Sequence, residues 1–187
     1  MSDLEKTYPE LFYRGITVPN MINLEYKRVL GDVFRFDGNH KNQNGYDEIS
    51  INWNDDINSL ENIKNQKKDE SSVLKYAKGI VQVPTKKIKE MKNRYQGDFS
   101  YERKPIENNE YHGNLLLNFD KMQKQWRKVI SDELAMNVEA IYIYNEEGND
   151  WTEYKTEVWL KARTNLAFYY SSKHPIINWE PSTNPFL

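Results

Sequence analysis

Five polar residues lie in or beside short apolar segments of the chain, where their side chains could do chemistry. They are Arg14 in LFYRGI, Arg35 in VFRFDG, Ser50 and Asn52 in EISINW, and His112 at the start of HGNLLL. A guanidinium group can bind phosphate, a hydroxyl or an amide can orient a ligand, and a histidine can transfer a proton near neutral pH. Together these residue types suit a small polar cleft that takes a nucleotide-like ligand.

In such a cleft Arg14, Arg35 and Asn52 would bind the ligand, and Ser50 and His112 would be the catalytic candidates. Each residue also has a structural interpretation. An arginine on a strand can form an ion pair or point to water, because leaving it buried and unpaired is too costly. His112 can close a turn when its ring bonds a local carbonyl. The functional interpretation therefore requires Arg14, Ser50 and His112 to converge in one cleft.

The apolar run after His112 predicts where its ring lies. If the strand HGNLLL turns alternate leucines toward the core, His112 faces the other way. We therefore predict that the ring lies on the polar side of a central strand, near Ser50 or Arg14. Gly113 would let another backbone or a ligand come close, which is a common use of glycine in strands.

No sequence motif identifies a metal or a cofactor. The chain contains no P-loop, no GxGxxG, no HExxH and no GxSxG. The three histidines, His40, His112 and His174, are far apart in the sequence, and none has a second ligand at metal-binding spacing. We therefore expect no metal site and no resident cofactor.

An α+β fold is predicted to position these residues. Alternating or apolar runs predict strands at 11–16, 48–53, 77–83, 112–118, 138–144 and the start of 99–110, and Arg35 is interpreted as strand-borne too. Helical spacing predicts helices after Asp55-Asp56, after Pro84 and from Asn118 onward. Residues 151–169 also show helical spacing, although part of this segment could be a strand. The pattern favours a mixed or antiparallel sheet with helices packed on it.

Length and composition favour a single compact domain. We predict this domain over residues 1–171 of the 187 residues, followed by an extended C-terminal tail over 172–187. The formal net charge of −2 gives no general attraction to nucleic acid, although the basic segment 75–94 leaves such contacts open. The chain has no cysteine, no signal-peptide-like run and no apolar stretch of membrane-spanning length, which favours a cytoplasmic protein without a membrane partner.

Several short segments, taken in order, resemble a pattern in a family of small, uncharacterised bacterial proteins. The segments are LFYRGI, VFRFDG, EISINW, GIVQVP and PIENNEYHGNLLL, within residues 11–117. The family pattern has an early arginine, an AFR-like segment, an SVN-like strand, and an NPxH-like turn that enters a strand. The resemblance marks Arg14, Arg35, Ser50 and His112 and implies no established activity. The proline expected just before the histidine is missing here.

FYRGI and FRFDG also resemble segments of ADP-ribosyltransferase-like toxins, a class that includes enzymes that degrade NAD. This resemblance implies a split α+β sheet with a nicotinamide cleft and NAD as the cofactor. It also implies a downstream catalytic glutamate, for which Glu153 and Glu157 are the candidates. The tyrosine spacing usual in this class is not recognisable in the chain.

The sequence leaves two functions open. The first is a non-catalytic interaction or ligand-binding module, one partner of a bacterial two-gene system, because the chain lacks a catalytic motif. Trp179 and Phe186 in the tail could dock on such a protein partner. The alternative is an NAD-using transferase or hydrolase, in which Arg14 binds phosphate, Ser50 orients the ligand and His112 acts as acid or base.

Overall fold

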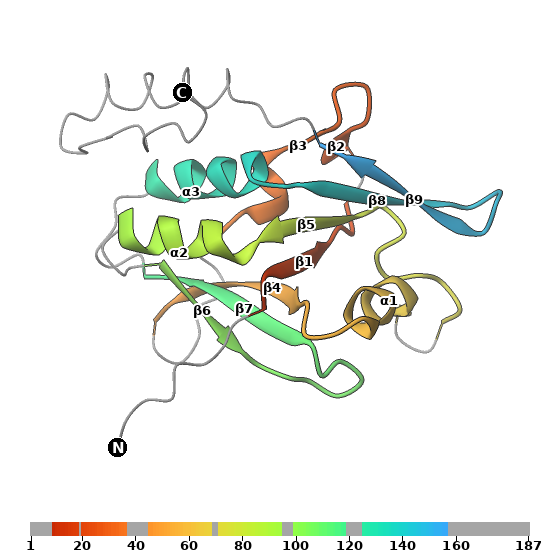
Figure 1. Cartoon of the computed structure of the whole chain (residues 1–187), viewed down its shortest axis with the longest axis horizontal. Helices are drawn as coiled ribbons and strands as arrows, with labels where there is room; N and C mark the ends of the chain where they lie inside the picture. Colours follow the sequence, from red (N-terminus) through yellow and green to blue (C-terminus); the bar gives the residue numbers. More distant parts are fainter. Residues whose placement is uncertain are drawn as a thin grey trace. The chain divides into compact units, whose positions relative to one another are not determined.

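The computed structural model describes residues 9–18, 20–36, 45–68, 71–94, 99–118 and 125–156, and its largest element is an antiparallel sheet (Figure 1). Within these residues the sheet has seven strands, in the order β6-β7-β4-β1-β5-β8-β9, and every neighbouring pair is antiparallel. The strands are β1 (Leu11–Gly15), β4 (Asp47–Trp53), β5 (Ile80–Pro84), β6 (Phe99–Arg103), β7 (His112–Leu117), β8 (Ala140–Asn145) and β9 (Asp150–Lys155). The predicted α+β class with an antiparallel sheet is therefore confirmed.

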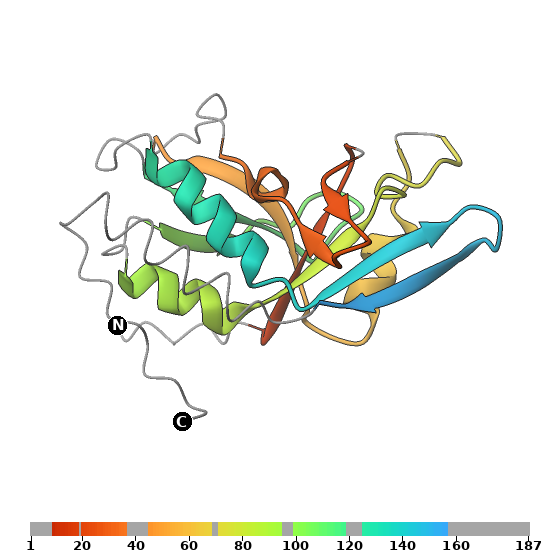
Figure 2. The same ribbon diagram turned by 90° about the horizontal axis from the view of Figure 1, so that it is seen from above.

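Helices and a small hairpin complete the elements of the described residues. The helices are α1 (Asn58–Asn65), α2 (Thr85–Arg94), α3 (Gln125–Met136) and the 3-10 helix η1 (Gly31–Phe34). The hairpin pairs β2 (Ile22–Asn23) with β3 (Arg28–Val29). The turn between β8 and β9 projects at the end of the sheet that lies away from α2 and α3 (Figure 2).

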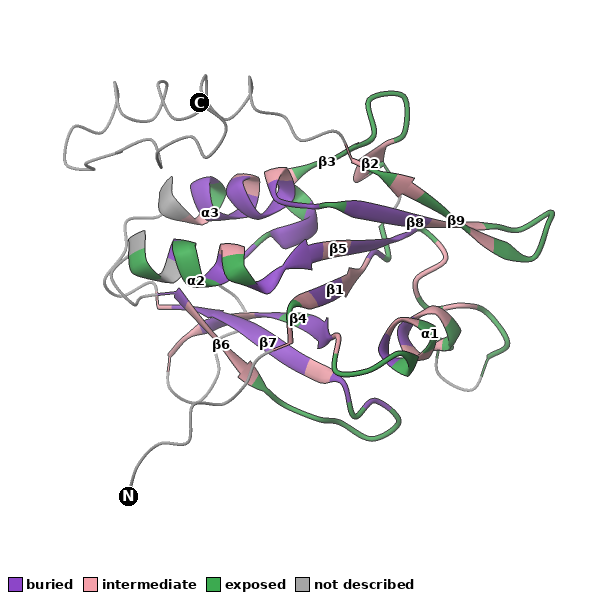
Figure 3. Ribbon diagram, viewed as in Figure 1, coloured by how far each residue is buried: buried purple, intermediate pink, exposed green. Residues whose placement is uncertain are grey.

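One face of the sheet, the helix-covered face, carries much of the core. On β4 every second residue points to this face. These residues are Ile49, Ile51 and Trp53, and each is at most 5 % exposed. Helix α2 contacts β6 and β5, the strand that leads directly into it. Helix α3 contacts η1. The Nη2 atom of its Arg127 lies 4.0 Å from the Oδ2 atom of Asp47 on β4. Figure 3 shows the buried layer that results.

The opposite face is polar along β4 and β7, and we call this part the polar face. Glu48, Ser50 and Asn52 alternate along β4 with the apolar residues of the helix-covered face. In the antiparallel register Ser50 lies opposite Asn114, and Asn52 lies opposite His112. No described helix covers the exposed Ser50 side chain. The alternation of EISINW thus predicts the two faces of β4 correctly.

Helix α1 covers the other part of this second face, along β1, β5 and β8. Its fully buried Ile63 packs in a cluster with Tyr13, Ile80, Ala140 and Tyr142. The helix follows the two acidic residues at 55–56, as predicted, and its apolar positions recur at helical spacing. The polar face therefore ends where α1 begins, and the loops around α1 stand beside it.

Two predictions of local structure are wrong. Arg35 is not on a strand, because η1 ends at Phe34. Val33 and Phe34 are both buried within one 3-10 turn, which ends where the Arg35 amide donates to the Asp32 carbonyl. The Ser131 hydroxyl of α3 donates to the Phe34 carbonyl at 2.8 Å and holds this turn.

The helical interpretation of the segment after residue 150 is also wrong over its described part, where the strand alternative is confirmed. Residues 150–155 form β9, which pairs with β8. Ala140 lies opposite Lys155 at one end of the pairing, and Asn145 lies opposite Asp150 at the other. Pairing with a neighbouring strand outweighs the helical spacing of the apolar residues here. The remainder of 151–169 lies outside the described residues, as do residues 119–124 at the predicted start of the third helix.

Several predicted features cannot be placed in this structure. The predicted boundary between 171 and 172 lies outside the described residues, together with His40, Glu157, His174, Trp179 and Phe186. The single domain over 1–171 and the tail over 172–187 therefore stay predictions. Within the residues that are described, no helix has both the length and the apolar character needed to cross a membrane.

Candidate functional site

The candidate site lies at a gap in the sheet, where β1 separates from β4. Strand β1 pairs with β5 along its whole length, from Leu11 to Gly15. It pairs with β4 only at Phe12 and Tyr13. Backbone groups that lose a strand partner in this way are costly unless another group satisfies them. The residue that follows Tyr13 is Arg14, and its side chain supplies that group.

Arg14 ties three segments together at the gap. Its Nη1 donates a hydrogen bond of 2.6 Å to the Ser50 carbonyl of β4, and its Nε donates to the Val33 carbonyl of η1. Burial lowers the pKa of Arg14 to about 10, so the group stays protonated at neutral pH. A guanidinium has five N–H donors, and Nη2 has no partner among the described residues. Arg14 therefore has a structural role and still presents donors to a ligand.

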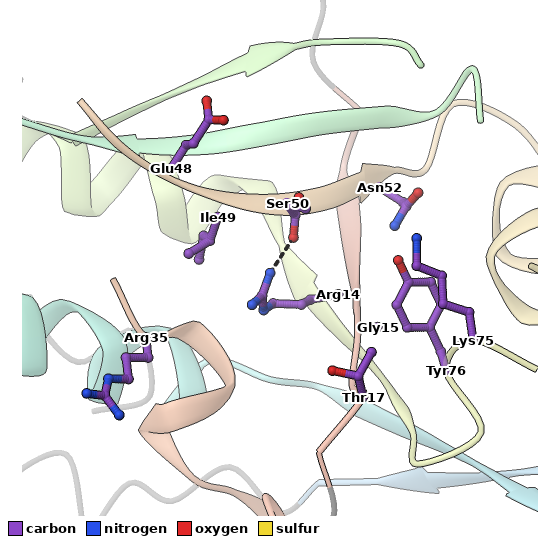
Figure 4. Close-up of a pocket in the computed structure, with 10 residues that line it drawn as sticks. All are labelled: Arg14, Gly15, Thr17, Arg35, Glu48, Ile49, Ser50, Asn52, Lys75 and Tyr76. Atoms are coloured by element: carbon purple, nitrogen blue, oxygen red, sulfur yellow. Dashed lines mark hydrogen bonds between the residues drawn. The ribbon is translucent and has the colours of Figure 1, made fainter. Parts of the chain in front are cut away.

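A pocket of about 350 Å³ opens at this gap, and we call it the arginine pocket (Figure 4). It is lined by Arg14, Gly15, Thr17, Arg35, Glu48, Ile49, Ser50, Asn52, Lys75 and Tyr76. In the view of Figure 4, Arg35 lies on one side of Arg14, while Lys75 and Tyr76 lie on the other. The structure thus brings together four of the five residues singled out in the sequence, namely Arg14, Arg35, Ser50 and Asn52.

Positive charge dominates the arginine pocket. Two arginines and Lys75 line it, against the single carboxylate of Glu48. The Arg35 side chain is exposed and has no partner among the described residues. Glu48 already accepts a hydrogen bond of 3.0 Å from Asn114 and lies 3.4 Å from the Lys104 ammonium. The pocket therefore suits an anion, because three cations face one carboxylate that already has partners.

An aromatic ring lies beside these cations. A Cβ at Gly15 would lie 2.2 to 2.4 Å from ring atoms of Tyr76, so the ring rests directly on the glycine backbone. The Lys75 ammonium lies 5.4 Å from the centroid of the same ring, within cation–π distance. The sequence places Lys75 and Tyr76 at the start of the basic segment 75–94 but does not assign either residue to this cleft. Their position depends on a loop that folds back, in which the Lys75 amide donates to the Gln66 carbonyl at 2.8 Å.

His112 does not line the arginine pocket. It lies opposite Asn52 on the polar face, and its Nδ1 lies 2.6 Å from the carbonyl oxygen of Lys104. The Lys104 amide in turn donates to the His112 carbonyl at 3.0 Å. This arrangement matches the turn-closing interpretation of the histidine. Arg14 and Ser50 meet at the gap, and His112 does not join them.

The described residues also give no sign of a metal centre. No three His, Asp or Glu side chains in that part of the chain are placed to hold a metal ion. Glu153, one candidate for the catalytic glutamate implied by the toxin resemblance, lies on β9 and does not line the arginine pocket. The chain matches no model of a known protein family, no curated protein and no solved structure.

Proposed function

We propose that the protein is a ligand-binding module and that the arginine pocket takes an anionic, nucleotide-like ligand. The observation that carries the proposal is the meeting of Arg14, Arg35 and Lys75 around one hollow of about 350 Å³. Guanidinium and ammonium groups favour phosphate oxygens, and Tyr76 adds an aromatic side chain to the lining of the same hollow. The exposed Ser50 adds a hydroxyl that can donate to or accept from the ligand.

Binding is favoured over catalysis by the position of the candidate acids and bases. His112 bonds the Lys104 carbonyl outside the pocket, and Glu153 lies on another strand. The alternative, an NAD-using transferase or hydrolase, would have to use Glu48, the carboxylate that lines the pocket. Turnover of NAD by the purified protein, abolished by Glu48→Gln, would support this alternative against the binding function.

The test is isothermal titration calorimetry with pyrophosphate, ADP and UDP as probes. We expect saturable binding that weakens as the salt concentration rises, because part of the attraction is Coulombic. Arg35→Gln removes a cation that makes no hydrogen bond or ion pair within the described structure, so it should weaken binding by about tenfold without altering the fold.

Arg28→Gln is the matched control for this experiment. Arg28 is also an exposed arginine, but it lies on β3 over the Tyr26 ring and does not line the arginine pocket. Its replacement removes the same net charge and should leave affinity within about twofold, as expected for a distant charge screened by salt. Equal losses in the two variants would mean that general charge attraction, and not the pocket, causes the binding. No binding of any of the three probes would reject the proposed function.

A further inference from the structure

A second hollow of about 870 Å³ lies between α1 and the segment 106–111, and we call it the amide hollow. We propose that it continues the arginine pocket as one groove and holds a sugar-like, polyhydroxylated part of the ligand. In this arrangement the anionic group of the same ligand occupies the arginine pocket, so the inference rests on the proposed function. The ligand class is therefore a nucleotide sugar, in which a phosphate-bearing half is joined to a neutral sugar.

Shared and bonded residues connect the two hollows. Lys75 lines both of them. Asn52 lines the arginine pocket, and its Oδ1 accepts a hydrogen bond of 2.6 Å from Asn109, which lines the amide hollow. The two asparagines are 3 % and 5 % exposed, so this bond forms a buried wall common to both hollows. A ligand that lies over it can reach both.

The amide hollow is rich in groups that both donate and accept hydrogen bonds. Six amide side chains line it, those of Asn58, Asn62, Asn65, Gln66, Asn108 and Asn109. Within the described residues, the Asn58 and Asn108 side chains make no hydrogen bond, and Asn62 uses only its oxygen, toward Gln66 at 3.3 Å. Amides of this kind match hydroxyl groups, because each hydroxyl also donates and accepts.

The two ends of the groove differ in charge. The amide hollow is lined by three carboxylates, those of Glu61, Glu107 and Glu110, against the two ammonium groups of Lys67 and Lys75. It therefore does not favour a second phosphate, whereas carboxylates accept hydrogen bonds from sugar hydroxyls. Cations dominate the arginine pocket instead, so a ligand with one anionic end and one neutral end fits the groove in one orientation.

The test compares two nucleotide sugars with their parent nucleotides by calorimetry on the full chain. The probes are UDP-glucose with UDP, and GDP-mannose with GDP. Several hydrogen bonds to the sugar should make at least one nucleotide sugar bind about tenfold more tightly than its parent. The double variant Asn58→Ala/Asn62→Ala should remove this gain and leave the affinity for the parent nucleotide unchanged. Both changes put alanine on a helix, so the variant should fold.

Lys68→Ala is the control, since Lys68 is exposed next to α1 and lines neither hollow. It should keep the gain from the sugar. Equal affinity of both nucleotide sugars and their parents would overturn this inference, as would a gain that survives the double variant. Those results would leave the proposed function intact if the parent nucleotides bind. Failure of the parent nucleotides and of pyrophosphate together would reject the proposed function, and with it this inference.

Discussion

Replacing Arg14 by glutamine should destabilise the protein, because Arg14 closes the gap between β1 and β4. The change removes two charge-assisted hydrogen bonds, to the carbonyls of Ser50 and Val33. Each such bond contributes about 1.5 to 3 kcal/mol, and the lower end applies because the side chain is only half-buried. The loss in the free energy of unfolding should therefore be about 3 kcal/mol, which lowers the melting temperature of a chain of this size by about 6 to 12 °C.

Urea unfolding followed by tryptophan fluorescence measures this loss, since Trp53 is fully buried in the same sheet. Arg35→Gln is the matched comparison, because Arg35 lines the same pocket without a hydrogen bond or ion pair to the described residues. It should change the free energy of unfolding by less than about 0.5 kcal/mol. If Arg14→Gln costs no more than Arg35→Gln, the structural role assigned to Arg14 is wrong.

Three further predictions concern the surroundings of the site. Gly113→Ala should lower the free energy of unfolding by about 1 to 3 kcal/mol in urea titrations, because its Cβ would lie 2.2 Å from Trp53 Nε1 and 2.5 Å from the Glu102 carbonyl. His112→Asn should lower the free energy of unfolding by about 1 kcal/mol, because the bond to the Lys104 carbonyl is lost, and it should leave nucleotide affinity unchanged. A loss of affinity at unchanged stability would instead indicate a functional role for His112. Burial, and then the Glu153 carboxylate, raise the pKa of Tyr142 above its usual 10.0, so the unfolded state ionises first and stability falls as pH rises above that value. The fall should reach about 1.4 kcal/mol per pH unit from this group, and Tyr142→Phe should make the measured decline shallower, whereas an unchanged slope would contradict the assignment.

The alternation of apolar residues explains why much of the sheet could be predicted. Ile49, Ile51 and Trp53 recur at every second position, and burial on the helix-covered face follows directly. The 3-10 helix η1 could not be predicted in the same way, because Val33 and Phe34 are both apolar and adjacent. The hairpin of β2 and β3 has two residues in each strand, which is too short for any periodicity.

The candidate site could be predicted only in part, for a similar reason. Arg14 stands out because it is polar within a mostly apolar strand, and Ser50 because it lies on the polar face of a strand whose other face is apolar; both are local properties of the sequence. Their meeting depends on how far β1 pairs with β4, which is a matter of register between distant segments. Lys75 and Tyr76 reach the pocket through a folded-back loop, and no local pattern indicates where such a loop lies.

The most direct test of the anion-binding pocket is an NMR titration with pyrophosphate. Spectra of the ¹⁵N-labelled chain report the backbone amides of Gly15, Ser50 and Tyr76 and the Nε–H groups of Arg14 and Arg35. We predict saturable shifts at these five positions with one common dissociation constant, because all of these residues line one pocket. Shifts that are absent there, or that spread over exposed lysines without saturation, would contradict the account.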